Sequence, residues 1–138
     1  MLKKVLTILS ALVLIICLFF LNNSPLFTGD TSGYEIYLDD CSNSNAIVRI
    51  KQGDYPFIFN KKGESVCIEK QNFELHSFLL EMKARLIFSE QIDGKICYYA
   101  YSPKIKYIES VKNQNINLQI VVSDVVVKVG SPIIYGSF

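Results

Sequence analysis

The sequence predicts an α+β protein: an antiparallel sheet with one main helix packed on one face, preceded by an N-terminal transmembrane helix. Three observations support this class. Residues 5–21 form an uncharged, apolar run whose only polar members are Thr7 and Ser10. Most of the remaining chain alternates apolar and polar residues, which is typical of half-buried antiparallel strands. One central segment instead repeats apolar residues at helical spacing. The 50% hydrophobic content therefore divides between a membrane segment and a folded domain.

The apolar run Val5–Leu21 follows Lys3 and Lys4 and contains no charged residue. Its length is close to the lower limit of about 17–25 residues that a helix needs to cross a bilayer. Because basic residues stay on the cytoplasmic side, the lysine pair predicts a cytoplasmic amino terminus and an exported carboxyl-terminal domain. We therefore expect a single-pass protein of the cell membrane.

Two interpretations of this run stay open, a retained signal-anchor and a cleaved signal peptide that would leave a secreted domain. Cleavage requires small residues at the −3 and −1 positions. The chain offers Asn22–Ser24 followed by Pro25, so the retained anchor is favoured. The expected organisation is an anchor or signal at 1–25, a tether at 26–33 and an extracytoplasmic domain at 34–138.

The charge balance bears on the partner class. Two of the 14 Lys and Arg residues precede the apolar run, which leaves 12 against 13 Asp and Glu and a formal charge of −1 in the exported part. Nucleic acid binding depends on a strongly basic surface, so we expect no nucleic acid partner. The expected partners are the membrane, through the N-terminal helix, and another protein of the cell envelope.

Strands are predicted before the helix, where alternation begins at Tyr34. Val48 and Ile50 alternate with charged neighbours, and residues 61–63 are predicted to form a turn between strands at 57–59 and 65–69. The helical segment then places apolar residues at i, i+3, i+4, i+7 and i+11, which line one helix face: Leu75, Phe78, Leu79, Met82 and Leu86. Asn72 is the expected N-cap, and basic residues at 83 and 85 suit the last turn.

Beyond the helix, alternation and turn residues predict five further strands: 87–92, 95–101, 105–111, 116–123 and 125–129. Asp93-Gly94 is the hairpin turn between the first two, and polar residues 113–115 form a later turn. The clearest strand is 116–123, for which strict alternation predicts one buried and one wet face. Gly130-Ser131-Pro132 is expected to break the last strand.

The carboxyl-terminal part combines the strand Asn117–Val121 with the run Val127-Lys128-Val129-Gly130-Ser131-Pro132-Ile133. These two motifs resemble the carboxyl-terminal signature of the YwmB-like family of Firmicutes proteins, over about residues 73–138. The resemblance implies a TATA-box-binding-protein-like fold, in which a curved antiparallel sheet carries helices on one face. It also implies an exported protein connected with the cell envelope or sporulation, and it supplies no catalytic residues.

Candidate catalytic groups are few. His76 is the only histidine and lies beside the apolar face of the helix, where an imidazole is usually a surface or boundary residue. No spacing typical of a metal site accompanies it, so we expect no metal and no cofactor. A small cell-envelope hydrolase that pairs Cys67 or Cys97 with His76 stays the alternative to a binding module.

Outside the membrane segment the chain has Cys41, Cys67 and Cys97, an odd number that permits at most one disulfide. Cys67 and Cys97 fall within predicted strands and are expected to be buried thiols, while Cys41 with Cys67 would be the more local bridge. Asp39-Asp40 are adjacent, and neighbouring strand residues point to opposite faces. A solvated strand end therefore explains them at least as well as a glycosidase pair.

The densest aromatic cluster comprises Tyr98, Tyr99, Tyr101 and Tyr107. One interpretation is an exposed interaction patch, and the other is cross-strand packing within the sheet. With no catalytic set in view, the sequence predicts a binding or interaction module of the cell envelope, and an enzyme is the less favoured class.

Overall fold

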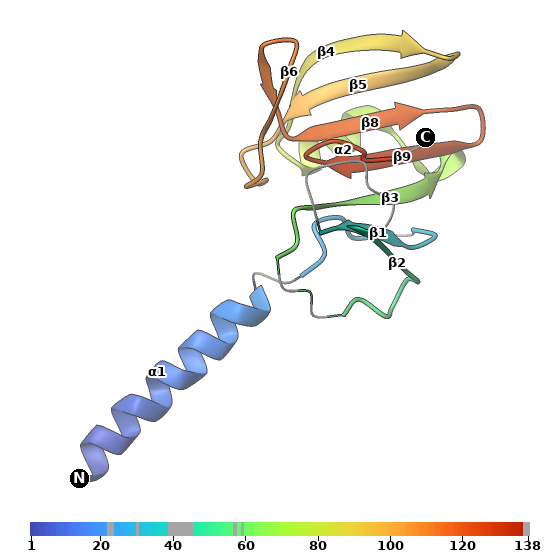
Figure 1. Cartoon of the computed structure of the whole chain (residues 1–138). Coiled ribbons are helices and arrows are strands. Elements are labelled where there is room, and N and C mark those ends of the chain that lie inside the picture. The colour runs from blue at the N-terminus through green and yellow to red at the C-terminus, as the bar shows by residue number, and fades with distance from the viewer. Residues whose placement is uncertain (22–23, 30, 39–45, 57, 59, 137–138) are drawn as a thin grey trace.

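Figure 1 shows the computed structural model of the protein, which describes residues 1–21, 24–29, 31–38, 46–56, 58 and 60–136. The N-terminal helix α1 (Leu2–Leu21) projects away from a folded domain. Its segment Leu2–Phe19 is long and apolar enough to cross a membrane, and none of that segment is buried inside the protein. The predicted N-terminal apolar helix is therefore confirmed, and it suits either a membrane anchor or a signal sequence.

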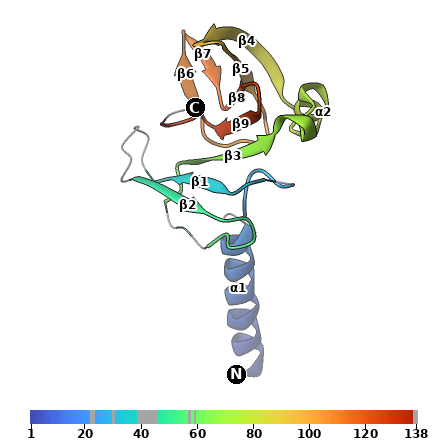
Figure 2. The same ribbon diagram turned by 90° about the vertical axis from the view of Figure 1, so that its right-hand side faces the viewer.

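The domain is α+β, as predicted. An open antiparallel sheet of seven strands has the order β2-β1-β3-β9-β8-β5-β4, and Figure 2 shows that it curves strongly. Its strands are β1 (Tyr34–Tyr37), β2 (Ile47–Ile50), β3 (Gly63–Glu69), β4 (Arg85–Ile92), β5 (Lys95–Tyr101), β8 (Leu118–Val122) and β9 (Val126–Ser131). A separate hairpin pairs β6 (Glu109–Val111) with β7 (Gln114–Ile116), and the short helices η2 (Lys70–Asn72) and α2 (Leu75–Glu81) follow β3.

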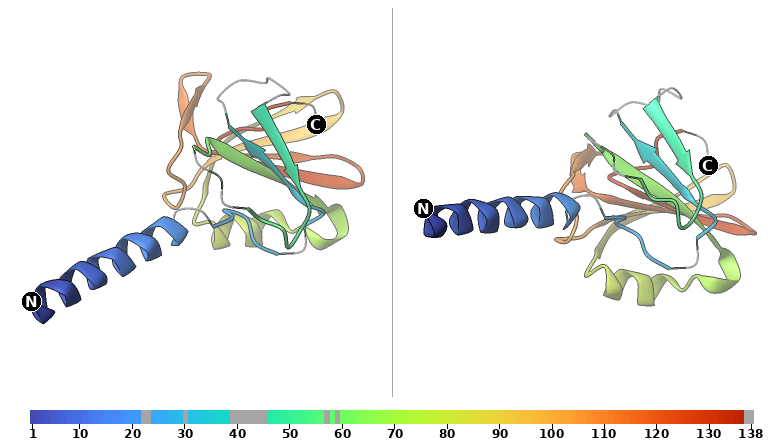
Figure 3. Two further views of the ribbon diagram at one scale, coloured as in Figure 1. Left: turned by 60° about the horizontal axis from the view of Figure 1, so that its bottom comes forward. Right: turned by 90° about the horizontal axis from the view of Figure 1, so that it is seen from below.

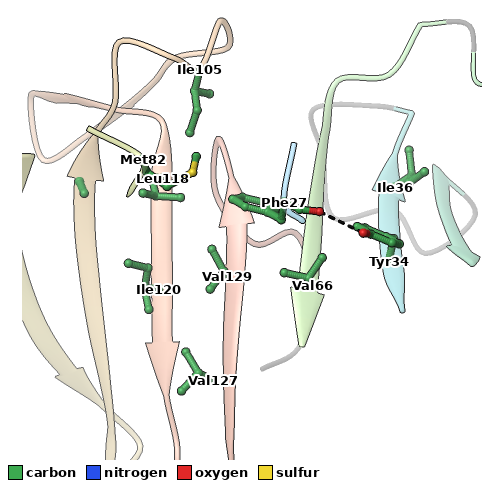
Figure 4. Packing of buried hydrophobic residues seen from close by; sticks show 11 residues of the cluster. Phe27, Tyr34, Ile36, Val66, Met82, Ile105, Leu118, Ile120, Val127 and Val129 are labelled. Atoms are coloured by element: carbon green, nitrogen blue, oxygen red, sulfur yellow. Dashed lines mark hydrogen bonds between the residues drawn. The ribbon is translucent and has the colours of Figure 1, made fainter. Parts of the chain in front are cut away.

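The sheet face that carries α2, which we call the helix face, holds the larger core (Figure 4). Cross-strand pairing aligns Val66 of β3 with Val129 of β9, and Val129 with Ile120 of β8. All three are at most 1% exposed. Phe78 and Leu79 of α2 pack against this cluster, so the predicted apolar helix face is confirmed. Each buried aliphatic side chain of this size contributes about 1.5–3 kcal/mol.

The opposite face of the sheet, which we call the rear face, is partly covered by the chain beyond β9. Ile134 lies so close to Gly130 that a Cβ at that position would be 2.5 Å from the Ile134 Cγ1, which explains why glycine stands there. Cys97, Tyr99 and Val121 form a second, smaller core with Ile134. The strands between the two cores are therefore covered on both sides.

Strand β8 shows the consequence, because the wet face predicted for 116–123 is absent. Asn117 is 0% and Gln119 is 5% exposed. Asn117 accepts a hydrogen bond from the Ser102 amide (2.7 Å) and donates to the Ser102 carbonyl (2.7 Å), and Gln119 accepts from the Ile134 amide (2.8 Å). Buried amides with such partners are well tolerated. The prediction was wrong because alternation does not show that a distant segment covers the polar side.

Helix α2 is shorter than the periodicity predicts. It begins after Glu74, whose carboxylate accepts hydrogen bonds from the amides of residues 76 and 77, so Glu74 and not Asn72 is the N-cap. It ends at Glu81, with Met82 as the C-cap, because Lys83 adopts a left-handed conformation with φ 50°. Leu86, expected on the helix, instead lies in β4 and is 43% exposed.

Other boundaries also differ. The strand predicted at 105–111 is reduced to β6, and its turn falls at Lys112 and Asn113, which have φ values of 51° and 60°. Two positive φ values suit a tight hairpin turn. Strand β9 continues through Gly130 to Ser131, where a break was expected.

Before β3 the strands expected from Tyr34 and around Val48 and Ile50 are present as β1 and β2, but the strand and the turn expected at 57–63 differ. Residues 57 and 59 of the strand predicted at 57–59 lie outside the described residues, and Ile58 is not in a strand. The turn predicted at 61–63 is displaced, since β3 already begins at Gly63 and the left-handed residue is Asn60, with φ 65°.

Candidate functional site

Within the segment 26–33, predicted to be a tether, the described residues 26–29 and 31–33 are part of the folded domain. Phe27 is 3% exposed and belongs to the core of the helix face. The backbone amides of Leu26 and Phe27 donate to the same carboxylate oxygen of Glu64, at 2.5 and 3.1 Å. The Tyr34 hydroxyl donates to the Phe27 carbonyl at 3.0 Å (Figure 4). The chain is therefore fixed to β3 shortly after α1 ends.

The second carboxylate oxygen of Glu64 contacts two further side chains. It accepts a hydrogen bond from the Tyr55 hydroxyl at 2.5 Å and pairs with the Lys61 ammonium at 3.0 Å. Lys61 also donates to the Ser24 carbonyl at 3.2 Å. Burial, followed by the adjacent Glu64 carboxylate, raises the pKa of Tyr55 far above its ordinary value. We call this set the Glu64 clasp: Ser24, Leu26, Phe27, Tyr55, Lys61 and Glu64.

A groove surrounds the carboxyl-terminal end of β3, and we call it the β3 groove. Its larger part, of about 940 Å³, lies between residues 31–32, the segment 67–72 and the β8–β9 turn at 124–126. Its smaller part, of about 270 Å³, lies between residues 26–29 and 31 and helix α2. Both parts are lined by Thr31, Ile68 and Asn72, so the two hollows meet at these residues.

Thr31 is the most unusual residue of the β3 groove. The residue is 5% exposed, and its hydroxyl has no hydrogen-bond partner within the described part of the chain. Burying a hydroxyl without a partner costs about 1–3 kcal/mol. Thr31 lines both parts of the groove, whose walls combine apolar and polar side chains, as those of binding sites commonly do.

A charged cluster lies on the rear face beside the groove. The Glu35 carboxylate pairs with Lys128 at 2.7 Å and with Arg49 at 3.1 Å, and it accepts a hydrogen bond from the Ser65 hydroxyl at 3.3 Å. Strands β1, β2 and β3 also frame a third hollow of about 380 Å³, which shares Ser32 and Cys67 with the β3 groove. The cluster and the groove therefore form one continuous surface region.

The electrostatics of the cluster do not favour proton transfer or thiol attack. Burial raises the pKa of Glu35, but the hydrogen bonds and charges of Lys128 and Arg49 outweigh it and hold that pKa below its ordinary value. Burial raises the pKa of the Cys67 thiol despite nearby Lys128. Glu35 is therefore ionised and Cys67 protonated at neutral pH, whereas a cysteine nucleophile needs a lowered pKa.

The cysteine–histidine pair considered from the sequence is not assembled. Val66 and Ile68 belong to the core of the helix face, so Cys67 between them points to the rear face. Cys97 belongs to the second core on that same face. His76 is exposed on α2, on the other side of the sheet. Burial raises the pKa of Cys97 as well. Cys67 and Cys97 are free thiols, and Cys41 lies outside the described residues.

The four tyrosines considered as a patch do not share one surface. Tyr98 packs against the core of the helix face, whereas Tyr99 is 6% exposed in the rear core. Tyr101 is half-buried at the end of β5, and Tyr107 is 38% exposed in the loop before β6. Tyr99 stacks on Phe88 at 4.4 Å. Successive strand residues point to opposite faces, so cross-strand packing describes the cluster better than a patch.

The remaining candidates from the sequence are the acidic pair and possible metal ligands. Asp39-Asp40 lie outside the described residues, so their environment is not assigned. The described residues contain no group of three or more His, Cys, Asp or Glu side chains arranged to hold a metal ion. Sequence reasoning missed the β3 groove because its walls come from three separate segments, among them the supposed tether. The one available signal was the pair Leu26-Phe27, apolar residues in an otherwise polar stretch.

Comparisons of the chain with models of known protein families, with curated proteins and with solved structures give no match.

Proposed function

We propose that the protein is a membrane-anchored, extracytoplasmic binding module that holds a segment of another cell-envelope protein in the β3 groove. Helix α1 supplies the anchor, with Lys3 and Lys4 on the cytoplasmic side. The observation that carries the proposal is the buried, unpartnered Thr31 hydroxyl where the two parts of the groove meet. A role in the envelope or in sporulation is the more specific form, and it rests on the carboxyl-terminal motifs of residues 117–133.

Two features of the groove support a protein segment as the occupant. The walls offer Ile68, Phe73 and Phe78 as apolar contacts, which suit side chains of a peptide. The polar rim includes Glu69, Lys70 and Asn72, so a backbone can be bound along it by hydrogen bonds. The Glu64 clasp fixes one wall, because it holds residues 26 and 27 in place, and a preformed wall lowers the entropy lost on binding.

Site-specific photocrosslinking in intact cells tests this function. A photoreactive amino acid replaces Ser32, which is exposed and lines the groove, and in a matched control it replaces Ser89, exposed on β4. We expect one discrete crosslinked envelope protein from position 32 and none from position 89. Equal crosslinking from both positions, or none from position 32, would contradict the groove as the binding site.

The anchor needs its own test. An epitope tag at the carboxyl terminus, combined with protease treatment of cells whose outer layers are removed, reports the side on which the domain lies. We expect a membrane-bound chain that keeps α1 at full length and is digested from outside. A shortened, soluble product would favour the cleaved signal peptide, and a protected tag would reverse the topology.

A further inference from the structure

One end of the domain carries a cluster of exposed basic and apolar residues from two loops, which we call the basic loop surface. The first loop precedes β3 and the second connects β5 to β6. The surface consists of Lys62, Lys104, Lys106, Tyr107 and Ile108. Tyr107 and Ile108 are 38% and 50% exposed. We infer that this surface rests on an anionic bilayer, so that the domain docks on the membrane in which α1 is anchored.

One hydrogen bond joins the two loops, and another joins the second loop to α2. The Tyr107 hydroxyl donates to the Lys61 carbonyl at 2.6 Å, which joins the second loop to the residue beside Lys62. The Lys104 ammonium donates to the carbonyl of Glu81, at the end of α2, at 2.6 Å. The basic loop surface is therefore a defined part of the fold and not a set of unrelated side chains.

The position of this surface follows from the Glu64 clasp. Lys61 donates to the Ser24 carbonyl at 3.2 Å, and Ser24 is three residues beyond Leu21, the last residue of α1. Three extended residues span at most about 10 Å. Figures 1 and 3 show the loop between β5 and β6 on the side of the domain from which α1 projects, and the β8–β9 turn on the opposite side. The surface thus lies where the chain leaves the membrane.

The chemistry of the surface matches a lipid headgroup layer. The loops at 60–62 and 103–108 contain four lysines and no acidic residue. Among the described residues, no ion pair includes Lys62, Lys104 or Lys106. Lysines close to a membrane are attracted to anionic lipids. Tyrosine favours the interface between headgroups and acyl chains, and Ile108 offers an apolar side chain to it.

This inference rests on the proposed membrane anchoring by α1. An acidic protein partner is the competing occupant of a basic surface, but the position beside the membrane helix favours lipid. Since a tethered domain remains within reach of the bilayer, even weak headgroup contacts would orient it. An oriented domain would present the β3 groove in one direction.

Tryptophan reporters test the inference, because the natural chain has no tryptophan. Three full-length variants are reconstituted into vesicles containing phosphatidylcholine brominated near the headgroup, with or without phosphatidylglycerol. Leu9→Trp reports α1, Ile108→Trp reports the basic loop surface, and Val125→Trp, at a residue 74% exposed in the β8–β9 turn, is the distance control. Circular dichroism checks that each variant folds.

We expect bromine to quench the Leu9→Trp reporter in both lipids. The Ile108→Trp reporter should be quenched in phosphatidylglycerol vesicles and less in phosphatidylcholine alone, and the Val125→Trp reporter in neither. Adding Lys62→Gln, Lys104→Gln and Lys106→Gln to Ile108→Trp should remove the increase due to phosphatidylglycerol, whereas adding Lys95→Gln, at the far end, should leave it.

The outcomes separate the two proposals. If Leu9→Trp is quenched while Ile108→Trp is quenched no more than Val125→Trp, the anchor stands and the docking surface is refuted. If Ile108→Trp is quenched to the same extent with and without phosphatidylglycerol, and with and without the lysine substitutions, recognition of anionic lipid is refuted. A Leu9→Trp reporter that escapes quenching would contradict the anchor, and the docking inference would fall with it.

Discussion

Lys61 and Glu64 form an ion pair inside the protein, with the ammonium 3.0 Å from the carboxylate and only 13% and 1% of the two side chains exposed. The same carboxylate binds the amides of Leu26 and Phe27. The pair therefore links the chain that emerges from α1 to strand β3, and it fixes a wall of the β3 groove.

Replacing Glu64 by glutamine should strongly destabilise the domain. Glu64→Gln keeps the shape but leaves the Lys61 ammonium buried without a counter-charge, for which losses of about 3–5 kcal/mol are typical. Urea unfolding of the full chain in detergent micelles measures the free energy. Glu64→Gln combined with Lys61→Met removes the stranded charge and should recover part of the loss. A loss of less than about 1 kcal/mol, as for an exposed pair, would show that the pair is not buried as described.

Replacing Lys83 by glycine should stabilise the protein. The amides of Lys83 and Ala84 bond to the carbonyls of Leu80 and Leu79, at 3.0 and 2.7 Å, which is a Schellman ending with lysine at the left-handed position. Glycine adopts that conformation without strain, so Lys83→Gly should raise the free energy of unfolding by about 1 kcal/mol. Lys83→Ala is the matched control and should give no gain. A loss in Lys83→Gly would argue against this ending.

The stability of the domain should fall in acid partly through Glu35. Its pKa is lowered in the folded protein, so its contribution is complete above the ordinary value of about 4.5 and disappears as pH falls through the lower folded value. Glu35→Gln should therefore reduce the loss of unfolding free energy below that pH. The pKa values of Glu74 and Glu90 are also lowered, so some loss should persist. If the unfolding free energies of the wild-type protein and Glu35→Gln fall identically with decreasing pH, the prediction is contradicted.

Cys67 and Cys97 should react slowly with iodoacetamide at neutral pH. Burial raises both thiol pKa values, and only the thiolate attacks. Mass spectrometry of the labelled full chain should show little modification at either site until denaturant is added. Rapid labelling of native Cys67 would indicate an activated thiolate and would restore the hydrolase alternative.

Local patterns were sufficient for the elements that neighbouring residues determine. The apolar helix at the amino terminus, the Asp93-Gly94 hairpin and the apolar face of α2 with Phe78 and Leu79 depend on spacing alone, and the structure has all three. The end of α2 was harder. It depends on the left-handed backbone of Lys83, a conformation for which glycine is the usual sequence signal.

The other misses at Gln119, Phe27 and the β3 groove share one physical cause, which is cover from distant segments. Gln119 is buried because Ile134 folds back over it, and Phe27 enters the core because Glu64, 37 residues away, holds its amide. The β3 groove depends on the same long-range contacts. Alternation shows which side of a strand faces the core, but it does not show whether a distant segment covers the other side. Neither the groove nor the unpartnered Thr31 could therefore be predicted from the sequence.

The Thr31 hydroxyl offers a way to separate binding from folding. In Thr31→Val a methyl group replaces the unpartnered hydroxyl with little change in shape, so the free energy of unfolding should rise by about 1 kcal/mol. Ser131→Ala is the matched control, since the Ser131 hydroxyl is also buried without a partner within the described residues but does not line the β3 groove.

The central claim, that a partner segment binds in the β3 groove, is tested most directly by the photocrosslinking yield from position 32 in Thr31→Val and in Ser131→Ala. If a partner segment occupies the β3 groove and bonds to Thr31, Thr31→Val should lower the yield although the protein is at least as stable, and Ser131→Ala should leave the yield unchanged. An unchanged yield in Thr31→Val, or an equal drop in both variants, would contradict the β3 groove as the binding site.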